Sequence, residues 1–148
     1  MTDQIKPAAR HRARELALQA LYQWQISGYD ATNSEARFRA QNHMGKADTG
    51  YFHELYKGVS SDPAVLDEAL APHIGRPVKD VDAIALSILR MACWELKERI
   101  DVPYKVVLNE AVDLAKRFGA TDAHKFINGA LDKLAAQLRA VEVAANTP

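Results

Sequence analysis

The sequence predicts an all-α protein of about seven helices. Apolar residues recur three, four and seven positions apart along most of its 148 residues, which is the pattern of helices with one buried face. Glycine, proline and capping residues separate these segments. The short β-branched run Val106-Val107 lies inside such a repeat and therefore predicts no strand. The length is that of one domain with a sizeable core.

The first predicted helix begins at Pro7, whose ring already holds a helical φ, and ends near Ile26, before Ser27-Gly28. The start of this helix is basic, whereas the whole chain has a formal net charge of +0, so the excess of cations is local. Asp3 is the one acid before residue 15. The cations are Lys6, Arg10, Arg12 and Arg14, and the predicted buried face is Ala13, Leu16, Ala17, Ala20, Leu21 and Trp24.

Capping residues divide the next part of the chain into three short helices. Ser34 is predicted to cap a helix that ends near Met44, and a second helix spans Tyr51 to Val59. Asp62 followed by Pro63 is the expected start of the third, because an N-cap acid is often followed by proline at the first helical position.

The second half of the chain contains the longest apolar helices. Asp80 is the predicted N-cap of a helix from Val81 to about Glu98, which is apolar on most sides and therefore belongs in the centre of the fold. A helix from Tyr104 to Phe118 ends at Gly119, and Thr121 caps the last one, which runs to about Leu138.

Two further features concern the end of the chain. Asn128-Gly129 lies inside the last helical repeat, where a glycine costs roughly 1 kcal/mol against alanine. This glycine is expected to admit another backbone, side chain or ligand at close range. Residues 141–148 contain little to fold and are predicted to form a flexible tail.

Composition excludes several classes of protein. The single cysteine, Cys93, permits no internal disulfide and indicates a buried thiol in a reducing compartment. No apolar stretch approaches the roughly 18 residues needed to span a bilayer, and the basic N-terminus lacks the apolar region of a signal peptide. A cytoplasmic protein without a membrane segment is expected. The scattered histidines form no metal motif, and no phosphate-binding glycine loop is present, so neither metal nor cofactor is predicted.

Three residues of the first helix are predicted to point away from its buried face. At about 100° per residue, His11, Leu18 and Tyr22 lie far from the apolar stripe and close to the arginines. Arginine forks can grip phosphates and a tyrosine ring can stack on a base or on a partner's side chain. The alternative is that the arginines are solubilising charges and that Tyr22 packs under a neighbouring helix.

A second polar cluster lies at the start of the last predicted helix. Its members are Asp122, His124, Lys125 and Asn128. His124 oriented by Asp122 could act as a general base, Lys125 with the free N–H groups of the helix start could bind a phosphate, or the cluster could simply cap the helix. The residues favour the capping interpretation first, then phosphate binding, and catalysis least.

Three blocks of the chain, in order, resemble the NusB family of bacterial transcription antitermination factors. They are ARHRARELALQALYQWQ at 9–25, DVPYKVVLNEAVDLAKRFG at 101–119 and DAHKFINGALDK at 122–133. The resemblance runs through roughly residues 6–139. It implies a single domain over 1–140 with the NusB fold, in which an N-terminal helical subdomain of about 1–78 packs with a C-terminal one of about 79–140.

The same resemblance implies a function and partners. Such proteins bind the boxA element of ribosomal RNA transcripts together with NusE, a small-subunit ribosomal protein, and then load onto RNA polymerase with other Nus factors. The resemblance implies a protein that is not an enzyme, and the RNA methyltransferase domain to which NusB-like domains are sometimes fused is not expected in this sequence. A pure protein-interaction module, whose arginines meet an acidic partner, is the competing interpretation.

The resemblance also implies an RNA-binding set. The family's arginine-rich start corresponds to Lys6, Arg10, Arg12 and Arg14, and His11 stands where many members have arginine, which predicts a weaker or pH-dependent patch. The RNA-facing residues after Gly119 correspond to Asp122, Lys125 and Phe126, although Phe126 is also a candidate for the core. Tyr22 or Phe126 is expected to stack a base, and Leu18 and Tyr22 are expected to face RNA, NusE or a second copy in a homodimer.

Overall fold

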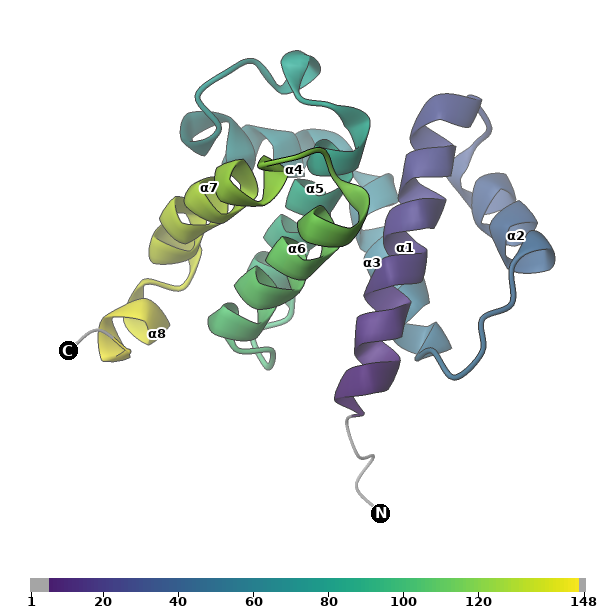
Figure 1. Cartoon of the computed structure of the whole chain (residues 1–148), viewed down its shortest axis with the longest axis horizontal. Helices are drawn as coiled ribbons and strands as arrows, with labels where there is room; N and C mark the ends of the chain where they lie inside the picture. The colour runs from purple at the N-terminus through teal and green to yellow at the C-terminus, as the bar shows by residue number, and fades with distance from the viewer. Residues whose placement is uncertain (1–5, 147–148) are drawn as a thin grey trace. The chain divides into compact units, whose positions relative to one another are not determined.

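The computed structural model describes residues 6–146, which are helical and contain no strand (Figure 1). The predicted all-α class is confirmed. The described residues divide into two compact units, one ending at Ser61 and one beginning at Asp62. The division differs from the expected one near residue 78, because the helix after Asp62 packs against two later helices and so belongs to the second unit.

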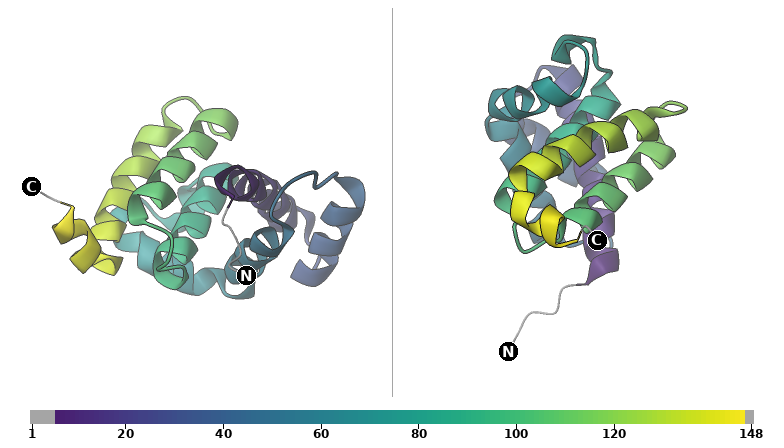
Figure 2. Two further views of the ribbon diagram at one scale, coloured as in Figure 1. Left: turned by 90° about the horizontal axis from the view of Figure 1, so that it is seen from below. Right: turned by 90° about the vertical axis from the view of Figure 1, so that its left-hand side faces the viewer.

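Three helices form the first unit, and α1 packs against both of the others (Figures 1 and 2). Asp30, and not Ser34, caps the second helix, because its side chain accepts a hydrogen bond from the Asn33 N–H while Ser34 is buried within the helix. Gly28, with φ of 78°, ends the first helix as predicted. The helices are α1 (Pro7–Ser27), α2 (Ala31–Gln41) and α3 (Thr49–Ser61).

Aromatic stacking forms part of the core of the first unit. The rings of Phe38 and Phe52 stack with centroids 5.8 Å apart, and those of Phe52 and Tyr56 are 6.3 Å apart. The Tyr56 hydroxyl donates to the Ala31 carbonyl at 2.7 Å, which satisfies its polar atom and connects α3 to the start of α2. Burial is the main cause that raises the pKa of Tyr56 above 10.0.

In the second unit, α5 packs against α4, α6 and α7, so the most apolar predicted helix is indeed central there. Arg90 of α5 forms two hydrogen bonds of 2.8 Å to the carboxylate of Asp67 on α4, so the one cation inside this apolar helix is paired. The helices are α4 (Pro63–Leu70), η1 (Ala71–His73), η2 (Val78–Asp80), α5 (Ala83–Glu98), α6 (Tyr104–Phe118), α7 (Ala123–Leu138) and α8 (Ala140–Ala145).

Two helix starts of the second unit differ from the prediction. Asp82 caps α5 in place of Asp80, because a 3-10 turn occupies the preceding residues and the Asp82 carboxylate accepts from the Ala85 N–H at 3.0 Å. At α7 the N-cap position is Asp122 and not Thr121, and no side chain caps this helix. The predicted cap Asp62 and the predicted limits of α6 are confirmed.

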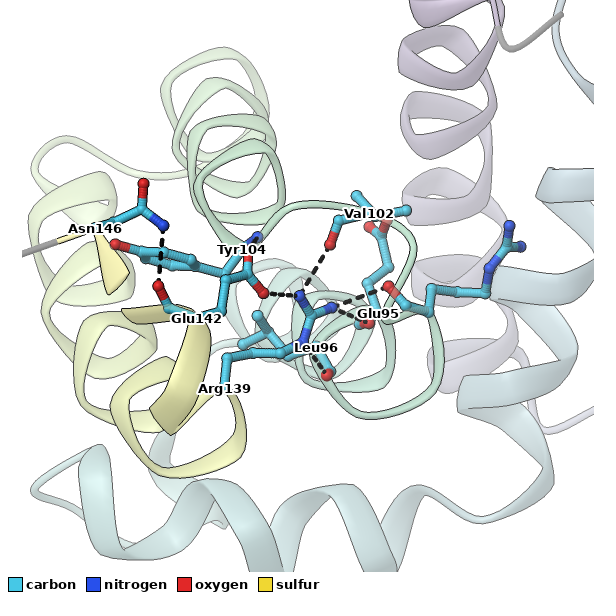
Figure 3. Close-up of polar contacts among 8 residues, drawn as sticks. Glu95, Leu96, Val102, Tyr104, Arg139, Glu142 and Asn146 are labelled. Carbon is cyan, nitrogen blue, oxygen red and sulfur yellow. Dashed lines mark hydrogen bonds and ion pairs between the residues drawn. The ribbon is translucent and has the colours of Figure 1, made fainter. Parts of the chain in front are cut away.

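A buried arginine joins the end of α5 to the C-terminal segment (Figure 3). Arg139 is 6% exposed and its guanidinium donates to the carbonyl oxygens of Glu95, Leu96, Arg99 and Val102 at 2.7–3.2 Å. These carbonyls lie at the end of α5 and in the turn that follows, where no helical N–H remains to satisfy all of them. One side chain thereby connects α7 to the turn between α5 and α6.

Glu142 completes this arrangement and explains why a helix forms where a flexible tail was predicted. Its carboxylate accepts from Arg139 at 2.6 Å and from the backbone N–H of Tyr104, at the start of α6, at 2.8 Å (Figure 3). The Tyr104 N–H is the main cause that lowers the pKa of Glu142, and Arg139 acts in the same direction. Residues 147–148 of the predicted tail lie outside the described residues.

Replacing Arg139 by alanine is expected to lower the free energy of unfolding by about 3–5 kcal/mol, because buried carbonyls and Glu142 lose a charged partner. Urea denaturation measures this change. Lys133→Ala, which alters an exposed cation of α7, is the control and should stay within about 0.5 kcal/mol of the unaltered protein. A loss below about 1 kcal/mol for Arg139→Ala would contradict the assigned role.

Glu142→Gln is expected to lower the unfolding midpoint at neutral pH. A carboxyl whose pKa is lowered by folding stabilises the protein above its unfolded pKa, and this contribution disappears as the pH falls through the folded pKa. The difference between the variant and the unaltered protein should therefore shrink as the pH is lowered from neutral to acid. Thermal melts across that range test this, and a difference independent of pH would refute it.

Candidate nucleic-acid interface

The exposed cations at the start of α1 are fewer than the sequence suggests. Lys6 is exposed, whereas the side chains of His11 and Arg12 are 41% and 43% exposed and both lie near Glu15. Arg12 Nη1 is 3.2 Å from one Glu15 oxygen and His11 Nε2 is 3.8 Å from the other. The buried Glu15 carboxylate thus offsets part of the positive charge, but Lys6, His11 and Arg12 still reach the solvent.

The other two arginines of the predicted patch lie against an aromatic ring. The guanidinium carbons of Arg10 and Arg14 are 4.3 and 5.3 Å from the ring centroid of Tyr51, which is 2% exposed. Arg14 itself is only 4% exposed, so the expectation that it contributes to an outer patch is wrong. Its place is in the packing of α1 on α3. Arg10 is intermediate in exposure and remains close to the surface.

Leu18 is also buried, at 1% exposure, which contradicts the predicted exposed position. The prediction assumed one buried stripe, but the middle of α1 is buried around most of its circumference, from Ala13 to Leu18. A contact of Leu18 with RNA, NusE or a second copy would require it to be accessible. Tyr22 is half-buried, so part of its ring is available.

The start of α7 presents a second group of predicted residues. Asp122 and Lys125 are well exposed and their charged atoms are 3.5 Å apart, a distance at which solvent screening leaves a weak interaction. Asp122 has φ of 67°, the left-handed conformation, and it is the one non-glycine with positive φ in the described part of the chain. The backbone therefore turns sharply here and presents both side chains to solvent.

Phe126 is half-buried and its ring is covered on one side by an arginine that the sequence did not single out. The guanidinium carbon of Arg76 lies 4.4 Å from the ring centroid. Arg76 comes from the connection between η1 and η2, fifty residues earlier in the chain, so no local pattern could have paired it with Phe126. The pair combines a guanidinium plane with an aromatic ring, both suited to stacking with an unpaired base.

The turn that leads to α7 depends on Gly119. A Cβ added to this residue would lie 2.7 Å from the Ala115 carbonyl oxygen, too close for any side chain without movement of the backbone. The Gly119 N–H donates to that same oxygen at 2.9 Å and ends α6. Glycine therefore permits the close turn that places Asp122, Lys125 and Phe126 after α6.

The catalytic alternative finds no geometric basis in the described residues. No hydrogen bond or ion pair joins His124 to Asp122 between residues 6 and 146. The same residues contain no group of three potential metal ligands. Among helices of residues 6–146, none has the length and apolar character of a membrane span. The fold and surface define a helical protein whose exposed cations and ring-stacked arginine suit nucleic-acid binding.

Comparison with known proteins identifies the family. The model of the NusB family matches residues 11–136. Transcription antitermination protein NusB of Teredinibacter turnerae is 54% identical over 139 residues, with 93% of this chain and 95% of that protein covered. The protein of the same name from Alcanivorax borkumensis is 47% identical over 148 residues, with 100% and 99% covered.

Solved structures show the same fold. NusB of T. maritima superposes with a TM-score of 0.75 at 23% identity, covering 93% of this chain and 94% of that one. A chain from the crystal structure of a plectonemic RNA supercoil gives a TM-score of 0.74 at 20% identity, with 95% and 99% covered. The chain belongs to the NusB family. It is a transcription antitermination protein and not an enzyme.

Gly129→Ala is expected to stabilise the isolated protein by about 1 kcal/mol. The expected close approach to Gly129 is not found among the described residues, since a Cβ there would meet nothing within 4 Å. Alanine would then only reduce the conformational freedom of the unfolded chain. Urea denaturation measures the change, with Gly119→Ala as the opposite case that should destabilise. A loss of stability in Gly129→Ala would show that the position is crowded.

Proposed function

We propose that this protein binds the boxA element of ribosomal RNA transcripts as a single strand, together with NusE. The observation that carries the proposal is the pair of exposed groups at the two helix starts. Lys6, His11 and Arg12 supply positive charge at α1, and Lys125 with the Arg76–Phe126 pair supplies charge and a stacking surface at α7. Each group uses the chemistry by which proteins hold single-stranded RNA.

The division of labour between these groups follows from their chemistry. Lysine and arginine side chains attract phosphates regardless of sequence, and they position the strand. Phe126 and the exposed part of Tyr22 offer ring faces to bases. Asp122, an acid on the same surface as Lys125, accepts hydrogen bonds from base amino groups and disfavours phosphate, so it contributes to selection of the sequence.

The cation set is small, which predicts modest affinity for RNA alone. Arg14 is buried, and Glu15 offsets part of the charge of Arg12. NusE would add RNA-contacting surface. An RNA strand that contacts both proteins would then bind more tightly, because the second contact forms at a high effective concentration. The resulting complex would join RNA polymerase with other Nus factors in the bacterial cytoplasm. Leu18 is left out of the proposed partner surface because it is buried.

The experiment that tests the proposal compares labelled boxA RNA with a scrambled RNA at two salt concentrations, with and without NusE. Fluorescence anisotropy should show preference for boxA, tighter binding with NusE and weaker binding in high salt. Equal weak binding to both RNAs, unaffected by NusE, would reject the proposal and favour the protein-interaction module. Sedimentation of the same samples tests for a homodimer.

The double variant Lys6→Ala, Lys125→Ala is expected to bind boxA RNA more weakly and with a smaller salt dependence. Each lost phosphate contact should reduce the slope of log affinity against log salt by about 0.7. The double variant Lys97→Ala, Lys133→Ala removes two exposed cations elsewhere on the chain and is the matched control for net charge. Equal slopes for the two double variants would remove Lys6 and Lys125 from the interface.

A further inference from the structure

A second cation–aromatic surface lies outside all the positions considered so far, between α1 and α2. The guanidinium carbon of Arg37 is 4.3 Å from the ring centroid of Tyr29, and both side chains are exposed, Tyr29 to 45%. Within residues 6–146, no carboxylate forms a salt bridge with Arg37. An exposed arginine that lies on an exposed tyrosine keeps both its charge and its planar face available to a ligand.

The backbone holds this pair in place. Gly28, with φ of 78°, ends α1, and Asp30 caps α2 two residues later, so Tyr29 occupies a short turn whose two sides are both helix ends. The Tyr29 N–H donates to Ser27 Oγ at 3.3 Å. Because the turn is short and capped, Tyr29 and Arg37 are positioned before any ligand arrives, which reduces the entropy lost on binding.

Arg37 supplies the positive charge of this pair. The nearest carboxylates in sequence are already engaged, because Asp30 caps α2 and Glu35 lies 3.8 Å from Arg39 and 2.7 Å from His53. Asn33 and Gln41 lie four residues before and after Arg37 on α2, are exposed, and so place amide groups on the same helix face. A cation that attracts phosphates and amides that pair with base edges therefore share one face of α2, which is the combination that suits single-stranded RNA.

The loop after α2 lies beside the start of α1, and Tyr29 lies at the other end of the same helix. The Asp48 N–H donates to the Ala9 carbonyl at 3.0 Å, which holds the loop after α2, with the exposed His43 and Lys46, beside the first turn of α1. Tyr29 follows the other end of α1, whose 21 residues span about 30 Å. A strand bound at Lys6 would therefore need several further nucleotides to reach Tyr29.

We propose that Tyr29 and Arg37 form a second RNA-contacting site that stacks an unpaired base of the sequence flanking boxA. This inference rests on the proposed function, because it takes the RNA at Tyr29 and Arg37 to be part of the transcript that carries boxA. The α2 surface then lengthens the bound RNA beyond boxA and raises affinity for the longer strand without changing affinity for the element alone. Arg39 is excluded from this site, because it is paired with Glu35 at 3.8 Å and lies over the ring of Phe52.

The test uses the full chain and four labelled RNAs. They are boxA alone, boxA with about ten unpaired uridines on its 5′ side, the same on its 3′ side, and a scrambled element carrying the favoured extension. The unaltered protein is expected to bind one extended RNA more tightly than boxA alone. Arg37→Ala and Tyr29→Leu should each bind that extended RNA about 5-fold or more weakly, and boxA alone with unchanged affinity.

Two further variants separate stacking from charge. Arg39→Ala, from the same helix with the same loss of charge, should keep the gain from the extension. Arg37→Lys keeps the charge but not the planar fork, so it should lose most of the gain. Circular dichroism melts confirm that each variant is folded.

The possible results each decide the inference. No gain from either extension, or equal loss in Arg37→Ala and Arg39→Ala, overturns it. Loss of NusE binding in Arg37→Ala with RNA binding intact also overturns it, in favour of a protein-docking surface. If boxA is not preferred over the scrambled element, the proposed function fails. The site at Tyr29 and Arg37 is then still decided by comparing the affinities of Arg37→Ala and the unaltered protein for the extended scrambled RNA.

Discussion

The guanidinium of Arg139 is the interaction on which the second unit most depends. A buried cation is costly unless its hydrogen bonds are satisfied, and here backbone carbonyls and the Glu142 carboxylate satisfy it. The carbonyls come from the end of α5 and the following turn, and Glu142 binds the first N–H of α6. The charge thus connects three helices at a point where the backbone itself has unpaired groups, and it gives α8 a reason to fold.

In the first unit, arginines divide between packing and exposure. Arg14 lies over the buried ring of Tyr51 and contributes to the core, whereas Arg12 reaches solvent beside Glu15. The same basic helix therefore stabilises the fold and presents charge. A count of cations in the sequence overestimates the binding surface, because it treats an arginine that covers a ring as equal to one that faces water.

Stacked pairs of arginine and aromatic rings recur in both units. Arg37 lies over Tyr29 in the first, and Arg76 over Phe126 in the second. Each pair presents a ring and a guanidinium plane, the two groups on which unpaired bases stack. Antitermination acts on transcripts while they are being made, when RNA is available as a single strand. Each compact unit thus contains one such pair.

The periodicity of apolar residues and the capping residues are local properties of the chain, and the sequence by itself determined the features that depend on them. These features are the all-α class, the limits of α6, the Asp62 cap and the central place of α5. It also determined the family, through three blocks in order. Only the tertiary structure decided that Leu18 and Arg14 are buried and that Arg139 organises the C-terminal segment. It also paired Arg76 with Phe126. These outcomes depend on residues far apart in the chain. The periodicity of a helix shows which of its faces is apolar, but not how much of its circumference other helices cover in the fold.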